Sequence, residues 1–209
     1  MEIHVLVEEE SAEAALGVLV PRILNGRAAH RIITFRGKQD LLGKLPQRLA
    51  GYRRRLEHED LRILVLIDED RSDCRALKAR LEDIARQAGL MTKSQATKTA
   101  SNAGQRFHVV TRIAVEELEA WYFGDESALY AAYDRLPVTL HRRKAYRDPD
   151  AIRGGTCEAL HRELKEAGYD LPVFPKIKVA REVAEHMEPA RNRSPSFRAF
   201  CAGLESFLT

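Results

Sequence analysis

The sequence predicts an α/β fold: a parallel sheet of about four strands flanked by helices, followed by a C-terminal helical extension. In residues 1–125, short apolar runs alternate with amphipathic stretches, and strands separated by helices form parallel βαβ units. From about residue 125 onward the pattern changes to helices punctuated by proline, without a convincing strand. We therefore expect residues 1–125 to form the α/β core and residues 126–209 a helical extension packed on it, as a second unit or as one continuous domain.

Four apolar, β-branched runs predict the strands, at Glu2–Val7, Arg31–Phe35, Leu61–Ile67 and Phe107–Val115. The third run, LRILVLI, is the strongest signal because all but one of its residues are apolar. Such a run is typical of a strand that is buried on both faces of a parallel sheet.

Helical spacing of apolar residues predicts helices between these strands, at Ser11–Leu24, Asp40–Leu56 and Asp73–Gly89, with another helix start at Glu116–Phe123. Gly89 is expected to cap the helix that begins at Asp73. The polar segment Met91–Arg106 predicts a loop. The extension is expected to hold helices at Ser127–Asp134, Cys157–Ala167, Ile177–Met187 and Ser196–Phe207, with at most a short strand at Val173–Phe174.

Composition narrows the class of protein. With 44% hydrophobic and 31% charged residues, the chain has enough apolar material to bury a core. Its three cysteines are far apart and form no Cys-x-x-Cys motif, so neither a disulfide framework nor a structural zinc site is supported. The sequence shows no signal-peptide pattern and no apolar run near the about 20 residues that a membrane span needs. We expect a soluble cytoplasmic protein with reduced thiols.

Acidic residues follow the predicted strands repeatedly. Glu8 comes after the first strand, Asp68 and Asp70 after the third, and Glu116 after the fourth. The carboxyl ends of parallel strands share one edge of a sheet, and side chains two residues apart in a strand point to the same side. Carboxylates that converge in this way repel one another unless a cation neutralises them, and Mg²⁺ prefers oxygen ligands. The alternative is that the acids only favour helix N-termini, which is the simpler interpretation of Glu9 and Glu10.

At these residues the sequence resembles the Toprim domain of topoisomerases, primases and overcoming-lysogenization-defect (OLD) nucleases. Glu8 in VLVEEES matches the glutamate after the first strand of that family, and Asp68 and Asp70 in LVLIDED match its Asp-x-Asp. The likeness is greatest to bacterial Toprim-like proteins that are often encoded beside ATPases, which share elements similar to AVEELEAW and SPSFRAF here. One departure is Glu9, where the common Toprim signature has glycine, so the loop is expected to differ in shape or in metal affinity.

The resemblance implies roles for the acids. Glu8 would be a general acid/base or a metal ligand, while Asp68 and Asp70 would hold Mg²⁺ or Mn²⁺. A second metal would use acids near the fourth strand, for which Glu116 and Glu119 are the candidates, one helical turn apart and so on one face. Glu117 is a third choice. A partner ATPase of the AAA or ABC type is implied by the family and by no residue.

Basic segments flank the acidic edge, and the chain carries a formal net charge of +3. The candidates for contacts with the phosphates of DNA or RNA are Lys38, Lys44, Arg48, Lys93, Lys98, Arg142 and Arg143. The simpler alternative is a set of solvated helix faces and loops. Aromatic residues are too sparse for a base-stacking platform, and Trp121, Tyr122 and Phe123 are expected to pack in the core.

Three functions follow from these patterns. The first is a Mg²⁺-dependent nuclease or related phosphodiester enzyme. The second is a non-catalytic Toprim-fold module that binds nucleic acid or a partner, which the missing glycine after Glu8 favours. The third is a phosphohydrolase or response-regulator-like protein with Asp68 as phosphoryl acceptor, although that chemistry normally places its nucleophile after the first strand, where Glu8 stands.

Overall fold

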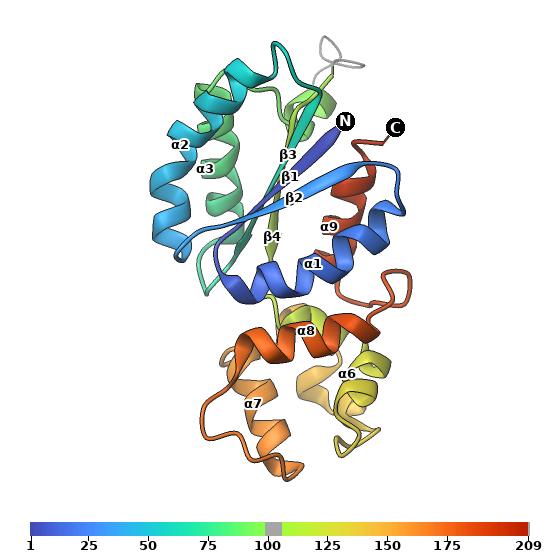
Figure 1. The fold of residues 1–209 in the computed structure, drawn as a ribbon. Helices are drawn as coiled ribbons and strands as arrows, with labels where there is room; N and C mark the ends of the chain where they lie inside the picture. The colour runs from blue at the N-terminus through green and yellow to red at the C-terminus, as the bar shows by residue number, and fades with distance from the viewer. Residues whose placement is uncertain (99–105, 209) are drawn as a thin grey trace.

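The computed structural model describes residues 1–98 and 106–208, and its centre is a four-stranded parallel sheet in the order β2-β1-β3-β4 (Figure 1). The strands are β1 (Glu2–Val7), β2 (Ala29–Thr34), β3 (Leu61–Asp68) and β4 (Val109–Ala114). Every residue of β3 is buried, as the apolar run predicted for a central strand. The α/β class with a parallel sheet, flanking helices and a C-terminal helix is therefore confirmed.

Helices cover both faces of the sheet (Figure 1). The first face packs against α1 (Glu10–Leu24) and α9 (Pro195–Glu205), and the second against α2 (Lys38–Arg55) and α3 (Cys74–Gln87). Because strand side chains alternate, Val5 and Val7 of β1 join the core of the first face, while Leu6 joins that of the second. Each face thus has its own hydrophobic core.

A helical lobe lies beyond the carboxyl ends of the strands (Figure 1). It contains α5 (Ala120–Gly124), α6 (Glu126–Ala132), α7 (Thr156–Glu166), α8 (Lys176–His186) and the short 3₁₀ turns η2 (Leu140–Arg142), η3 (Lys144–Tyr146) and η4 (Pro149–Ala151). α8 packs along α1, and the apolar core of the first face runs without interruption into the lobe. The boundary that we expect near residue 125 stays a prediction.

After the lobe, the chain returns to the sheet through α9, which packs on the edge strand β4. The approach is close at Gly203, where a Cβ atom would lie only 3.0 Å from Val110 and 2.9 Å from the Arg112 side chain. Arg112 in turn donates to the carbonyl of Ala199, at 2.6 Å. The last helix is therefore part of the layer that covers the sheet.

Two local expectations differ from the structure. The segment expected to be a loop contains a short helix, α4 (Lys93–Lys98), preceded by an isolated parallel bridge between Thr92 and Val109. The carboxylate of Glu82 on α3 accepts hydrogen bonds from the hydroxyls of Thr92 and Ser94, which fixes the start of this helix. The short strand expected at 173–174 is absent from the described chain, and Val173 is exposed.

The aromatic helix start and the Ser-Phe segment, which are far apart in the sequence, form one buried contact. Trp121 is fully buried, and its indole N–H donates to the Ser196 hydroxyl at 2.8 Å. The Phe197 ring packs edge-on against the indole, with the ring centroids 5.0 Å apart. These residues therefore join α5 to α9, and the prediction that Trp121 packs in the core is confirmed. No helix of the described chain is long and apolar enough to cross a membrane.

We predict that Ser196→Ala lowers the free energy of unfolding by about 1–3 kcal/mol, because the buried indole N–H loses its acceptor. Denaturant unfolding measures the change. The matched control is Ser127→Ala on the exposed side of α6, where we expect a change within about 0.5 kcal/mol. Equal stability of the two variants would contradict a structural role for the hydrogen bond.

Candidate metal site at the carboxyl ends of the strands

The centre of the candidate site is a buried pair of acids at the ends of β1 and β3. Parallel pairing of these strands brings their carboxyl ends together, and the backbone N–H of Asp68 donates to Glu8 Oε1 at 3.0 Å. Both side chains are nearly inaccessible, with 5% of Glu8 and 8% of Asp68 exposed. The other Glu8 oxygen, Oε2, is buried without a hydrogen-bond partner. The structure thus brings Glu8 and Asp68 together at the expected edge.

Glu119 adds a third buried carboxylate. Only 1% of it is exposed, its Oε2 has no hydrogen-bond partner, and its charge acts on Asp68. The hydroxyl of Tyr122, also fully buried and without a partner, lies in the field of Glu119 and Asp68. We call Glu8, Asp68 and Glu119 the buried acid trio.

Burial and mutual repulsion disfavour the charged forms of the trio. Burial raises the pKa of Glu8 to about 7, with Asp70 acting in the same direction, although the hydrogen bond from Asp68 opposes the shift. Burial also raises the pKa of Glu119 to about 7. The pKa of Asp68 lies well above its usual range, because of burial and then the charges of Glu8 and Glu119. The trio therefore shares protons near neutral pH unless a cation replaces them.

Asp70 does not continue the strand alternation that was expected to place it on the same side as Asp68. β3 ends at Asp68, and the chain then turns through left-handed conformations at Asp70 (φ 48°) and Arg71 (φ 60°). As a result Asp70 is 46% exposed and accepts a hydrogen bond from Lys38 Nζ at 3.3 Å. The period of two ends with the strand, so the two aspartates face different surroundings.

Lys38, a candidate for contact with nucleic acid, fastens this turn. Its Nζ lies 2.7 Å from the Asp68 carbonyl oxygen and 2.8 Å from that of Glu69, in addition to its contact with Asp70. Only 16% of the Lys38 side chain is exposed. Its charge is directed at the β3–α3 turn.

Glu116 and Glu119 do not share a helix face, contrary to the expectation from their spacing. Glu116 has a left-handed backbone (φ 61°) and α5 begins only at Ala120, so the intervening chain is a turn. The turn is held at the end of β3, because the Glu116 N–H donates to Glu69 Oε2 at 3.0 Å and its carbonyl accepts from the Asp70 N–H at 2.9 Å. Glu116 is partly exposed, while Glu119 is buried and its charge acts on Asp68.

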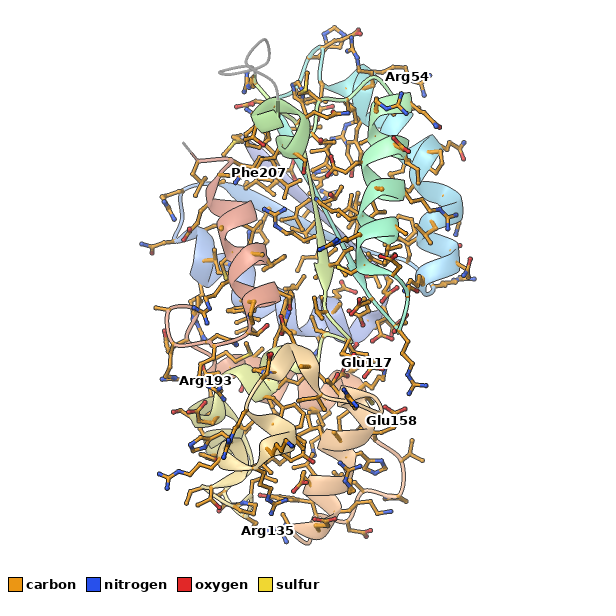
Figure 2. All side chains as sticks on the ribbon, turned by 180° about the vertical axis from the view of Figure 1, so that it is seen from behind. Arg54, Glu117, Arg135, Glu158, Arg193 and Phe207 are labelled. Atoms are coloured by element: carbon orange, nitrogen blue, oxygen red, sulfur yellow. The ribbon has the colours of Figure 1, made fainter. Side chains whose placement is uncertain are left out.

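Outside the trio, an acidic cavity of about 330 Å³ is lined by Asp70, Arg71, Glu116, Glu117, Gly155 and Glu158. Figure 2 shows Glu117 and Glu158 where the helical lobe meets the sheet. Glu117 Oε2 accepts hydrogen bonds from the Thr156 hydroxyl at 3.0 Å and the Cys157 N–H at 2.9 Å, so it holds the first turn of α7. Of the acids expected near a second metal, Glu116 and Glu117 thus line this cavity, together with Asp70, which was expected to bind the first metal with Asp68.

Glu9, which stands where the Toprim signature has glycine, has an ordinary extended backbone (φ −147°, ψ 165°). Glycine is therefore not required for the conformation of this loop. The Glu9 carboxylate accepts from the Ser11 hydroxyl and lies 3.6 Å from Lys176 Nζ. Burial alone would lower the pKa of Lys176, but the carboxylates of Glu119 and Glu9 raise it overall, so this lysine stays charged beside the trio.

The remaining basic candidates lie in separate places. Lys44 and Arg48 are on the exposed side of α2, and Lys93 begins α4. Lys98 ends α4, but its side chain falls outside the described part of the structure.

Arg142 and Arg143 belong to the helical lobe, and Arg143 has a structural partner there. Arg143 pairs with the buried Glu163 at 2.8 Å, and the Tyr146 hydroxyl donates to the same carboxylate at 2.6 Å. Arg142 is exposed nearby. The charge of Arg143 is thus compensated within the lobe.

Whether these residues fit a metal ion depends on the arrangement and the donor atoms of the buried acid trio. Within residues 1–98 and 106–208, no three carboxylate, imidazole or thiol groups are arranged closely enough to form a ready metal-binding group. The donors at the edge are nevertheless the hard oxygens that Mg²⁺ and Mn²⁺ prefer, and Glu8 and Glu119 each hold a buried oxygen without a partner. The chemistry of the donors therefore fits a hard divalent cation, while their arrangement in the described residues is not a closed set of ligands.

Comparisons with known proteins agree with this fold. A family profile described as "Domain of unknown function (DUF4276)" matches residues 7–205. The chain belongs to the DUF4276 family. Among solved structures, it is similar to the C-terminal region of the Burkholderia pseudomallei OLD protein, with a TM-score of 0.51 and 15% sequence identity over 99% of this chain and 98% of that chain. At this identity the likeness shows a shared fold. No curated protein matches the chain.

Two residues of this DUF4276 site were not expected from the sequence. Tyr122 was assigned to the core, and its ring is buried, but its hydroxyl faces the trio. The only signal for this role is its position directly after the AVEELEAW motif. Lys176 lies far along the chain in the lobe, in a segment without a motif, and only the fold brings it to Glu9 and Glu119.

We predict that the metal-free protein loses stability as the pH rises from about 4.5 to 7. Glu8 binds its proton more tightly in the folded state, so between these values the unfolded chain has lost a proton that the folded chain keeps. Glu8→Gln, which cannot ionise, should remove part of this slope and be more stable than wild type at pH 8 by up to about 3 kcal/mol. Denaturant unfolding in EDTA at several pH values measures the free energy of unfolding of each protein. The control is Glu10→Gln, at an exposed position, which should keep the pH profile of wild type. Parallel pH profiles for wild type and Glu8→Gln would contradict the prediction.

Proposed function

We propose that this protein is a metal-dependent nuclease of the Toprim type, which cleaves phosphodiesters with Mg²⁺ or Mn²⁺ bound at the carboxyl ends of β1 and β3. The observation that carries the proposal is the buried acid trio, in which the charges of Glu8 and Glu119 act on the buried Asp68 and two buried oxygens have no hydrogen-bond partner. Such an arrangement is costly for structure alone, and crowded acids with shifted pKa values are typical of functional sites. The fold shared with the OLD C-terminal region supports the same class.

Glu8, Asp68 and Glu119 would hold the first metal ion. Asp70 and Glu116, on the accessible side, would hold a second or the waters around it. A bound divalent ion supplies charge stabilisation for a phosphoryl oxygen and lowers the pKa of a bound water. The proposal thus includes one ion at the trio and allows a second ion at Asp70 and Glu116.

The chain's own groups would supply the proton chemistry and the positioning. Glu8, with a pKa raised to about 7, can take or give a proton at neutral pH. Lys38 holds the β3–α3 turn through the carbonyl oxygens of Asp68 and Glu69, which fixes Asp68 relative to Glu8. Lys176 contributes a nearby positive charge that limits the repulsion between Glu9 and Glu119.

The non-catalytic alternative loses one reason given for it, since Glu9 adopts a backbone that any residue can adopt. A module that only binds would bind nucleic acid equally well without metal. A phosphohydrolase that uses Asp68 as acceptor would form a covalent phosphoryl adduct there. A partner ATPase of the AAA or ABC type, and the choice between DNA and RNA, rest on the sequence resemblance.

We predict that purified protein cleaves plasmid or single-stranded DNA, or RNA, in Mg²⁺ or Mn²⁺ and not in EDTA. Asp68→Asn and Glu8→Gln should each lower the rate by roughly a hundredfold or more, since both alter the charge at the reacting centre. Asp83→Asn, an exposed acid on α3, is the control and should keep full activity. Cleavage that survives in an Asp68→Asn/Glu8→Gln double variant would sink the proposal.

A second prediction concerns metal binding without catalysis. Mn²⁺ at about 100 times its dissociation constant should stabilise the folded protein by about 2.7 kcal/mol, because only the folded chain brings the acids together. The Asp68→Asn variant should lose most of this gain, while Asp83→Asn should keep it. Thermal unfolding against Mn²⁺ concentration gives the measurement, and an unchanged response of Asp68→Asn would place the metal elsewhere.

A further inference from the structure

The outer side of α2 carries a groove of about 420 Å³ lined by basic side chains. Lys44, Arg48 and Arg55 follow one another at helical spacing, so they lie along one side of the helix, and Arg54 joins them at its end. Figure 2 shows Arg54 near the end of the molecule opposite the helical lobe. The row from Lys44 to Arg55 extends for about 16 Å along the helix axis.

Part of this positive charge is uncompensated. Lys44 is paired with Asp40 at 2.6 Å, and Arg55 binds Glu59 through two nitrogens, at 2.8 and 2.6 Å. In contrast, no carboxylate of the described residues lies within 4.0 Å of Arg48 or Arg54, and both side chains are exposed. The groove therefore presents two unpaired guanidinium groups to solvent.

The floor of the groove indicates which part of a ligand it would bind. Phe35 and Tyr52 line it, but both rings are buried, and the Tyr52 hydroxyl bonds His4 Nδ1 at 2.7 Å. The Arg48 guanidinium lies over the Phe35 ring, 6.0 Å from its centroid, which restrains its position. No ring is available for stacking a base, so the groove suits phosphates of a paired duplex better than an unpaired strand.

A second cavity adjoins the groove on the side of the carboxyl ends of the strands. It has a volume of about 390 Å³, shares Phe35 with the groove, and is also lined by Glu9, Glu10, Arg36 and Lys176. α2 itself begins at Lys38, whose ammonium group contacts Asp70. A phosphodiester backbone that followed α2 toward Lys38 would therefore approach the proposed metal site.

We propose that this α2 groove binds the phosphodiester backbone of a nucleic-acid duplex and delivers the adjoining strand to the carboxyl ends of β1 and β3. The proposal rests on the nuclease function for its purpose, but the binding itself needs neither metal nor cleavage. Arg48 and Arg54 are the residues that contact phosphate. Recognition is independent of base sequence, because the groove offers cations and no arrangement for reading base edges.

The test is binding of a fluorescent DNA duplex of about 20 base pairs to the full chain in EDTA, followed by anisotropy over about 50–200 mM salt. Arg48→Ala/Arg54→Ala should weaken binding about tenfold and lower the slope of log affinity against log salt by about 1 for each arginine. Arg48→Lys/Arg54→Lys should restore most of the affinity, since a phosphate contact needs the charge. In cleavage assays, the alanine variant should raise KM and leave kcat nearly unchanged.

The matched control is Lys144→Ala/Lys165→Ala, which removes the same charge from exposed positions in the helical lobe and should bind like wild type. Circular dichroism and unfolding of the arginine variants confirm that they fold. The proposal is overturned if Arg48→Ala/Arg54→Ala binds duplex as tightly as wild type, or if the control loses as much affinity as the arginine variant. It is also overturned if wild type binds single-stranded DNA as tightly as duplex. A wild type that binds no duplex in EDTA overturns it as well. Because these arms contain no metal, they succeed or fail separately from the cleavage by which the nuclease function is tested.

Discussion

The feature on which the rest of this structure depends is the burial of like charges at the carboxyl ends of the sheet. Parallel pairing brings Glu8 and Asp68 to the same edge, and the helical lobe excludes water from them. Removing a carboxylate from water costs several kcal/mol in real proteins. The folded chain limits that cost by retaining protons, as the raised pKa values of Glu8 and Glu119 show. A divalent cation would remove the same cost more effectively, because it attracts all the carboxylates at once.

The loops around the acids are strained, and hydrogen bonds hold them. Asp70, Arg71 and Glu116 all have positive φ, a conformation that costs a non-glycine residue of order 1 kcal/mol or more. The strain persists because hydrogen bonds link the loop after β3 to the loop after β4. The Glu69 carboxylate accepts from the Glu116 N–H, and the Glu116 carbonyl accepts from the Asp70 N–H. Lys38 also donates to the Asp68 carbonyl at the start of the first loop. Backbone strain therefore concentrates at the same edge as the buried charge, where a functional site is expected.

Sequence patterns predicted what local periodicity and strand order determine. The apolar run of β3 fixed its burial, and the positions of Glu8 and Asp68 after parallel strands were enough to bring them together. Patterns failed where the backbone leaves a regular period. Asp70 was expected on the same side as Asp68, and Glu116 on one helix face with Glu119, but left-handed backbone at Asp70 and Glu116 interrupts both periods. No residue spacing encodes such turns when the residues involved are not glycine.

Long-range neighbours were the other part that patterns could not supply, and they decide the charge balance of the site. Lys176 reaches Glu9 only because α8 packs along α1, and Glu117 holds α7 by its first turn. The helical lobe is thus attached through acids adjacent to the trio, so the packing of the lobe and the ionisation of Glu119 are linked thermodynamically. The lobe is for this reason part of the site's electrostatics and not only an appendage to the sheet.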